Sequence, residues 1–196
     1  FSDMKVSTIE TMPAGRKQPV TQLILENSFR SVLNEVNALL EEGHQLYVIC
    51  AAVDEKEAFK ARDVNKMYIN LSKLFYPRKV GMLHGQMSSE EKQSVMDAFA
   101  KNEIQVLVST TVVEVGMNVV NATGMIIYDA DRFGLSQLHQ LRGRIQRGNA
   151  VGKCWLLTDN KSEDVKERLN VLVKTTNGFE ISYEDLRLRG PGDILG

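Results

Sequence analysis

The sequence predicts an α/β protein built on a parallel sheet that helices cover on both faces. Short β-prone runs alternate with segments of helical periodicity along most of the 196 residues, and this order builds a parallel sheet. The predicted strands are continuously apolar, as strands buried on both faces are. The composition agrees with this fold class, because 43% hydrophobic and 25% charged residues are ordinary proportions for a globular domain.

In the first half of the chain, turn residues and apolar spacing separate the elements. Residues 1–19 are irregular, with turn signals at Pro13 and Pro19, and are interpreted as a linker or strap. From Phe29 the apolar residues follow the i, i+3, i+4 spacing of one helix face, which Gly43 closes. The other predicted elements are strands at 20–25, 46–51 and 80–83 and a helix at 64–75 that Pro77 stops.

In the second half, a capping box marks the start of a helix. Ser88 is followed three residues later by Glu91, and the helix that they open buries Val95, Met96 and Phe99. The elements that follow are strands at 105–109, 125–128 and 153–158 and helices from 135 to about 145 and from 163 to about 174. The tail after Lys174 is interpreted as a turn, a short helix and an irregular end, forming a small helical hairpin appended to the sheet.

The predicted organisation is an N-terminal strap (1–19), a sheet domain (20–160) and a hairpin (161–196). The chain lacks an initiator Met, and we expect it to be a piece of a longer protein. Its two cysteines, Cys50 and Cys154, lie in apolar runs, as buried thiols in a reducing compartment do. The charge is nearly balanced, with 24 basic and 25 acidic residues, but a local patch would suffice for binding nucleic acid.

Several common catalytic motifs are missing from the sequence. It contains no G-x-x-x-x-G-K-[ST] phosphate loop and no G-x-G-x-x-G dinucleotide motif. It has no clustered Cys and His with zinc spacing, so no metal site is expected in this chain. The absence of G-x-S-x-G removes the usual nucleophile of α/β hydrolases.

The densest basic group is Arg142, Arg144 and Arg147, within six positions of one another. Arg144 and Arg147 are spaced i, i+3, so they share one side if the helix continues. Arginine suits bidentate contacts with phosphate and can stabilise charge on a phosphoryl group during transfer. On spacing alone, a solvated basic helix end that complements the helix dipole is the simpler interpretation.

Two further candidate segments directly follow predicted strands. After residue 109 come the hydroxyls of Thr110 and Thr111 and then Gly116, which would let a ligand approach the main chain. His84 and Gly85 lie between a strand and a capped helix, whose N-terminus can attract an anion. The structural alternatives are a β-rich loop with a structural glycine and a satisfied turn histidine.

Open parallel sheets bind ligands beyond the carboxyl ends of their strands. We therefore expect the functional site to form at that edge. The segments expected there are the loops at 52–58, 84–87, 110–118 and 129–136 and the helix that ends near Arg147.

Taken together, these segments resemble the second motor domain of superfamily 2 helicases. Residues 110–119 (TTVVEVGMNV) are similar to helicase motif V, and residues 137–148 (QLHQLRGRIQRG) are similar to motif VI. Residues 131–144 are similar to a segment shared by the RecG branched-DNA helicases and the transcription-repair coupling translocases. Five segments resemble the RecG family specifically, at residues 3–9, 13–17, 110–116, 177–180 and 185–196.

This resemblance implies a RecA-like fold and an ATP-driven enzyme that remodels stalled replication forks and Holliday junctions by translocating on duplex DNA. It implies that Arg144 and Arg147 act as arginine fingers toward ATP and Mg²⁺, which a first RecA-like domain of the same protein would mainly hold. The implied nucleotide-site residues are Gly116, Asn118 and Gln140. The implied DNA contacts are His84, Gly85, Thr110, Thr111 and Arg142. The resemblance further implies a bacterial cytoplasmic monomer with no membrane partner, and a translocation loop that starts after Gly196.

Three positions depart from the family pattern. Gln146 replaces a glycine, Val120 replaces a proline, and Asn118 stands where aspartate is more usual. The Gln146 side chain fills space that a glycine would leave open, and Asn118 lacks a negative charge. The alternatives left open are the motor lobe of a coupling translocase and a non-catalytic interaction module. A small-molecule enzyme has less support, because no acid/base constellation occurs.

Overall fold

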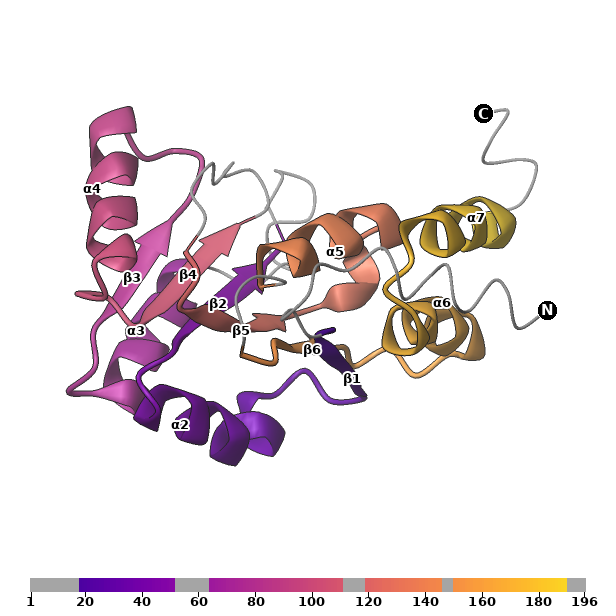
Figure 1. Cartoon of the computed structure of the whole chain (residues 1–196), viewed down its shortest axis with the longest axis horizontal. Coiled ribbons are helices and arrows are strands. Elements are labelled where there is room, and N and C mark those ends of the chain that lie inside the picture. The colour runs from indigo at the N-terminus through magenta and orange to yellow at the C-terminus, as the bar shows by residue number, and fades with distance from the viewer. Residues whose placement is uncertain (1–17, 52–63, 111–118, 146–149, 190–196) are drawn as a thin grey trace.

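A computed structural model describes residues 18–51, 64–110, 119–145 and 150–189. Six strands form one sheet in the order β1-β6-β5-β2-β4-β3, and every neighbouring pair is parallel (Figure 1). The strands are β1 (Val20–Ile24), β2 (Gln45–Cys50), β3 (Val80–Leu83), β4 (Val106–Thr110), β5 (Ala122–Ile127) and β6 (Lys153–Leu157). The predicted parallel sheet is therefore confirmed.

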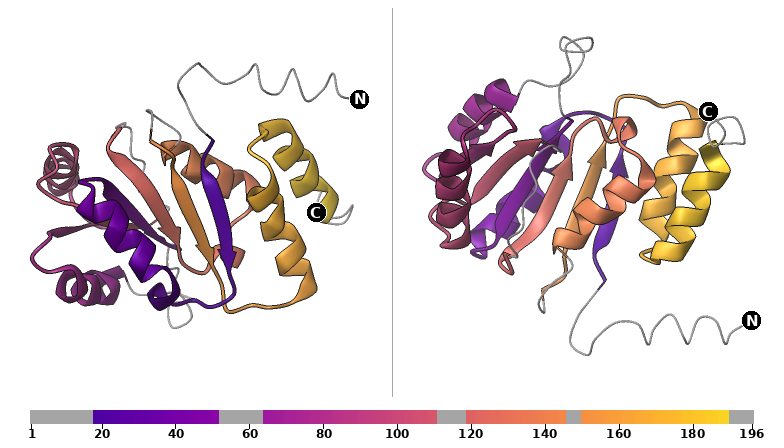
Figure 2. Two further views of the ribbon diagram at one scale, coloured as in Figure 1. Left: turned by 60° about the horizontal axis from the view of Figure 1, so that its bottom comes forward. Right: turned by 90° about the horizontal axis from the view of Figure 1, so that it is seen from above.

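Helices cover both faces of this sheet (Figure 2). The α-helices are α2 (Leu33–Glu41), α3 (Val64–Phe75), α4 (Ser89–Ala100), α5 (Leu135–Arg142), α6 (Glu163–Lys174) and α7 (Gly178–Arg189). The described residues also form three 3₁₀ turns, namely η1 (Phe29–Val32), η2 (Ala130–Arg132) and η3 (Gly143–Ile145). Residues of α2 and α3 share one hydrophobic cluster, and residues of α4 to α7 share the other.

The alternation of side chains along β2 shows why both faces are covered. Leu46 and Val48 belong to the cluster under α2 and α3, whereas Tyr47 and Ile49 belong to the cluster on the opposite face. All four are at most 4% exposed. A strand with two buried faces needs apolar residues at every position, which explains the unbroken apolar run in the sequence.

The predicted element bounds agree closely for α3 and β3 and differ at β5. β5 begins at Ala122, three residues before the predicted start at Met125. Its first residues are small because α2 packs closely on them. A Cβ atom at Gly124 would lie 2.7 Å from Leu39 Cδ1, so the strand carries no bulky apolar signal there.

The capping box is present at the start of α4, as the sequence predicts. Glu91 N donates a hydrogen bond to Ser88 Oγ at 3.1 Å, and Ser88 N donates to Glu91 Oε1 at 2.9 Å. The hydrogen bonds with Ser88 lower the pKa of the Glu91 carboxyl group. The box therefore fixes where α4 begins, directly after the loop that contains His84.

Replacing Ser88 by alanine is expected to lower the free energy of unfolding by about 1 kcal/mol, since it removes the acceptor for an N-terminal amide of α4. Urea unfolding followed by circular dichroism measures this change. Ser31→Ala is the control, because Ser31 is exposed in η1 and donates only a long bond of 3.5 Å to Ser28 O. An unchanged midpoint for Ser88→Ala would contradict the capping role.

The two C-terminal helices form a hairpin at one end of the molecule, beside β1 and α5 (Figure 1). α7 has 12 residues, like α6, and is longer than the short helix expected from the tail. Leu169, Leu172 and Ile181 of these helices are at most 1% exposed and belong to the main hydrophobic cluster. The hairpin is therefore anchored in the core of the sheet domain.

Both cysteines are buried thiols outside any disulfide. Burial raises the pKa of Cys154 to about 12.

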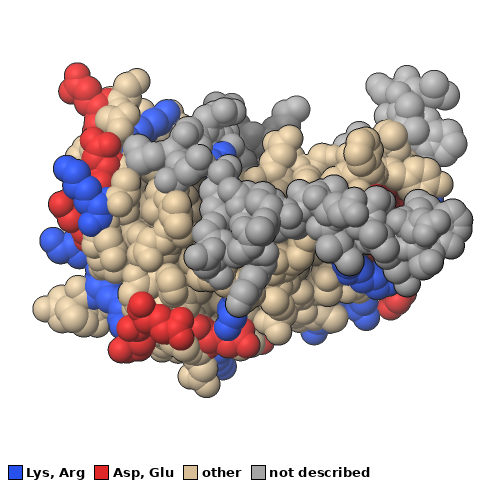
Figure 3. All heavy atoms as spheres, in the orientation of Figure 1, with Lys and Arg blue, Asp and Glu red and all other residues tan. Residues whose placement is uncertain are grey.

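Among the described helices, none is both long and apolar enough to cross a bilayer. On the face shown in Figure 3, charges of both signs alternate over α4 and carboxylates gather over α2, so the described part of this face has no broad basic patch.

Candidate functional site

The carboxyl ends of β3 and β4 bring two of the predicted segments together. Leu83 of β3 lies opposite Ser109 of β4 in the register, so the next residues, His84 and Thr110, follow neighbouring strand ends. His84 is half-buried and Gly85 is exposed. The loop is tight, because Gln86 N donates to His84 Nδ1 at 3.2 Å. Thr110, His84 and Gly85 thus share one edge of the sheet.

Thr110 presents an unusual hydroxyl at this edge. Its residue is 7% exposed, and Oγ1 has no hydrogen-bond partner within the part of the chain that the structure describes. Its carbonyl accepts a bond from Ser109 Oγ at 3.1 Å. A buried hydroxyl without a partner is costly, so a polar ligand such as a phosphate oxygen would satisfy it.

Several candidate residues lie outside the described residues. These are Thr111, Gly116, Asn118 and Arg147, together with the departure at Gln146. Of the other departures, Val120 is described and is 61% exposed. The roles of the undescribed residues stay predictions.

The end of the arginine-bearing helix is not where the sequence led us to expect it. α5 starts beyond the carboxyl end of β5 and runs back across the sheet. The Ile145 carbonyl lies against Gly152, the residue before β6, where an added Cβ would be 2.7 Å from it. The α5–η3 segment therefore ends near the amino end of β6. The expected position was wrong, because a helix that connects parallel strands must return to the opposite edge.

The candidate site residues consequently form two groups. His84, Gly85 and Thr110 follow strand ends at the carboxyl edge. Gln140 is exposed on α5, and Arg144 is half-buried in η3 at the far end of the same crossover. α5 begins at the carboxyl edge of the sheet, and η3 ends near the amino edge. This crossover therefore spans the distance between the two edges.

Arg142 lies inside the protein, which corrects the expectation that it would contact DNA. Its side chain is 1% exposed. Nη1 donates to Thr21 Oγ1 at 3.1 Å and to Leu172 O at 2.6 Å, and Nη2 donates to Thr175 O at 3.1 Å. The guanidinium therefore joins the end of α5 to β1 and to the C-terminal turn of α6, and these donors face away from solvent.

The burial of Arg142 follows from its position on α5. Leu135, Leu138 and Arg142 are spaced i, i+3, i+7, and the two leucines are fully buried, so the arginine continues the core-facing stripe. Burial lowers the pKa of Arg142, although arginine remains protonated at neutral pH. This spacing is visible in the sequence and indicates a buried position, whereas the resemblance to a helicase motif implied a DNA contact.

His139 is affected by this buried charge. Desolvation lowers its pKa, and the positive charge of Arg142 lowers it further. Within the described residues, its Nδ1 atom is buried and has no hydrogen-bond partner. His139 is therefore neutral at pH 7, between α5 and the start of α7, where Gly178 approaches its Nε2 atom.

Acidification is expected to destabilise the protein through His139. A histidine whose pKa is lower in the folded state binds protons more readily when unfolded, so stability is full above the unfolded pKa of about 6.5 and decreases as the pH falls below it. Urea midpoints at pH 7.5 and pH 5.5 measure the effect. His139→Gln should reduce this pH dependence, whereas an identical dependence in the variant would exclude His139 as its source.

A polar network that the sequence did not reveal stabilises the carboxyl edge at β1, β5 and β6. Asp129 N donates to Asn27 Oδ1 at 3.0 Å, Asn27 Nδ2 donates to Asp129 Oδ1, and Asn27 N donates to Asp159 Oδ1 at 2.8 Å. Asp129 has a φ of 51°, a left-handed conformation that Asn27 helps to hold. No group of three metal-ligating side chains occurs among the residues that the structure describes.

Comparison with known protein families identifies a helicase domain. Residues 28–149 match the helicase conserved C-terminal domain. Over all of its residues, the chain is 49% identical to the ATP-dependent DNA helicase RecG of Bacillus subtilis and 46% identical to that of Staphylococcus aureus (strain NCTC 8325 / PS 47). The chain spans 29% of the length of each of these relatives.

Comparison with solved structures agrees with the match to a helicase domain. A structure of RecG bound to a three-way DNA junction is similar over 93% of this chain and 24% of that chain, with a TM-score of 0.77 and 40% sequence identity. The C-terminal domain of Dbp5 from S. cerevisiae, in a structure with Gle1 and IP6, is similar over 80% of this chain and 83% of that chain. Its TM-score of 0.55 and identity of 16% indicate a shared fold.

Proposed function

The chain belongs to the family of helicase conserved C-terminal domains, and from this premise we propose that it is the second motor lobe of a RecG-type, ATP-dependent DNA helicase. The full enzyme would remodel branched DNA, such as stalled replication forks and Holliday junctions, by translocating on duplex DNA. The observation that carries this assignment is the 49% identity to a RecG helicase over every residue of the chain, on a RecA-like fold.

The carboxyl-edge group would contact DNA. The Thr110 hydroxyl, which has no partner among the described residues, can donate to a phosphate oxygen, and the neighbouring loop at His84 and Gly85 is accessible. Thr111 would add a second hydroxyl. Such contacts recognise the phosphate backbone, so we expect binding that is largely independent of sequence and weakened by salt.

The group at the end of α5 would contact the nucleotide. Arg144 would act as an arginine finger that stabilises charge developing on the transferred phosphoryl group, and Arg147 would act with it. Gln140, together with Gly116 and Asn118, would line the cleft on this side. We assign Mg²⁺ to ATP bound mainly by the first RecA-like lobe, because proteins usually hold this ion with one or two carboxylates together with the phosphates of the nucleotide.

Arg142 would connect the motor to the hairpin. It lies two residues before Arg144, and its hydrogen bonds reach Leu172 O and Thr175 O at the end of α6. A displacement of Arg144 during closure on ATP would therefore be passed to α6 and α7 through short, directed bonds. We propose that the hairpin carries this motion to a translocation loop, and that the enzyme acts as a cytoplasmic monomer.

The decisive test is ATP hydrolysis measured with and without forked DNA. The full-length enzyme should hydrolyse ATP in a DNA-stimulated manner, because both lobes are then present. The 196-residue chain alone should not, since its sequence contains no phosphate loop. DNA-stimulated hydrolysis by the chain alone, or none by the full-length enzyme, would contradict the assignment.

A further inference from the structure

The outer side of α7 exposes a row of large apolar side chains. Phe179, Tyr183 and Leu186 are 89%, 65% and 52% exposed. Their i, i+4, i+7 spacing places them on one side of the helix. We name this set the α7 stripe. Single exposed apolar residues are ordinary, but a contiguous row of them marks an interaction surface.

The α7 stripe is fixed in its outward orientation by the opposite side of the helix. Ile181 is 1% exposed in the main hydrophobic cluster. Asp185 is 7% exposed and accepts a hydrogen bond from Ser136 Oγ at 3.3 Å. Rotating α7 to bury the stripe would break these contacts with α5 and the core, so the stripe stays available to another surface.

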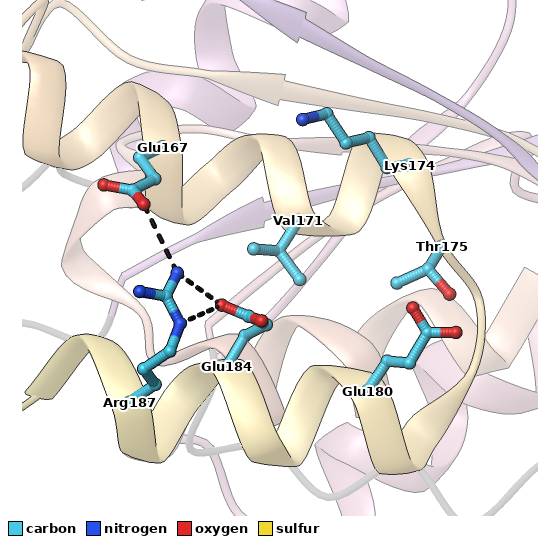
Figure 4. Close-up of a pocket in the computed structure, with 7 residues that line it drawn as sticks. All are labelled: Glu167, Val171, Lys174, Thr175, Glu180, Glu184 and Arg187. Atoms are coloured by element: carbon cyan, nitrogen blue, oxygen red, sulfur yellow. Dashed lines mark hydrogen bonds and ion pairs between the residues drawn. The ribbon is translucent and has the colours of Figure 1, made fainter.

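An acidic groove lies between α6 and α7 (Figure 4). Its three α7 residues each follow a stripe residue by one position in the sequence, so the groove and the stripe occupy neighbouring sides of this helix. It has a volume of about 380 Å³ and is lined by Glu167, Val171, Lys174, Thr175, Glu180, Glu184 and Arg187. Arg187 Nη2 lies 3.3 Å from Glu167 Oε2 and 2.6 Å from Glu184 Oε1. Three carboxylates thus face two cations, and one of these cations already bridges two of the carboxylates.

We propose that the α7 stripe and this groove together dock a polypeptide segment of the same enzyme that carries apolar residues flanked by Lys or Arg. The apolar residues would cover Phe179, Tyr183 and Leu186, and a basic side chain would enter the groove near Glu180. This inference rests on the proposed function, which makes the chain one lobe of a longer enzyme.

Charge favours this occupant over two others. The lining of the groove has one more carboxylate than cations, and this net negative charge disfavours DNA phosphates. A symmetric second copy would bring one such groove beside another. A basic, apolar segment complements both parts of the surface. The RecG relatives extend far beyond this chain, which spans 29% of their length, and an intramolecular segment binds at a high effective concentration.

Photo-crosslinking in the full-length enzyme with forked DNA tests the docking face. p-Benzoylphenylalanine replaces Tyr183 in one variant and Tyr76 in a control, because Tyr76 is 82% exposed directly after α3 and away from the hairpin. The expected result is an intramolecular adduct from position 183 to a peptide that is rich in Lys or Arg and apolar residues and lies outside residues 18–189. No such adduct should form from position 76.

An adduct from position 183 to DNA, an adduct to a second copy, or no adduct would overturn the docking face. Adding Glu180→Lys should abolish the adduct, and its persistence would overturn the basic character of the occupant. DNA-stimulated ATP hydrolysis is measured on the same samples. If the unsubstituted enzyme shows no DNA-stimulated hydrolysis, the proposed function is contradicted. If hydrolysis is intact but the adduct is missing, only the docking face is contradicted.

Discussion

Replacing Arg144 by alanine in the full-length enzyme is expected to lower the ATP turnover number by roughly 10³-fold or more, the effect of removing an arginine finger. DNA binding should remain nearly unchanged, because Arg144 lies in η3 at the end of the α5 crossover, whereas Thr110 and His84 follow strand ends at the carboxyl edge. Steady-state hydrolysis at saturating DNA and a binding titration on forked DNA measure the two effects separately.

The matched control for this variant is Arg78→Ala. Arg78, in the turn between α3 and β3, pairs with the exposed Glu41 at the end of α2 at 2.9 Å, and a surface ion pair of this kind contributes at most about 1 kcal/mol. Its turnover number should equal that of the unsubstituted enzyme. An unaltered turnover number in Arg144→Ala would remove this residue from the catalytic group, and an equal loss of DNA binding would place it in the DNA contacts.

Replacing Arg142 by alanine is expected to lower the free energy of unfolding by about 3 kcal/mol or more. The change leaves Thr21 Oγ1, Leu172 O and Thr175 O without their donor and opens a cavity in the core. Urea unfolding of the purified protein measures this loss. The charge itself is not the source of the stability, because a buried guanidinium is costly to desolvate.

Two variants separate the contributions of the Arg142 bonds. Thr21→Val removes a single acceptor and should cost about 1 kcal/mol. Arg142→Met refills much of the volume without restoring any donor, so it should recover part of the stability and none of the coupling to the hairpin. Wild-type ATP turnover in a folded Arg142→Met enzyme would contradict the proposed connection between Arg144 and α6.

The sheet and most of its helices could be predicted because local signals and tertiary packing agree. The apolar run of β2 reflects burial on both faces, and the Ser88 capping box marks the start of α4. The predicted β5 was too short because Gly124 gives no apolar signal. A glycine is needed there because Leu39 of α2 packs closely on the strand, and no local pattern in the sequence reveals this contact.

The sequence identified candidate residues for the site, but it predicted their arrangement in space only in part. Thr110 and His84 lie at the expected edge because strand ends in a parallel sheet have a fixed polarity. Arg144 was expected at the same edge, although a crossover helix must end at the other one. The resemblance implied a DNA contact for Arg142, whereas its spacing from Leu135 and Leu138 places it on the buried side of α5. The Asn27–Asp129 pair joins residues 102 positions apart and left no local trace.

The burial of both cysteines has a practical consequence for measuring motion between the two proposed lobes. Maleimide dyes react with thiolates at accessible positions, whereas burial raises the pKa of Cys154 to about 12 and leaves Cys50 with no exposed surface. A cysteine introduced at the exposed Glu90 of α4 would therefore be the reactive thiol of this chain. A fluorophore there, paired with one on the first lobe, would report cleft closure as energy transfer, without removal of the native cysteines of this chain.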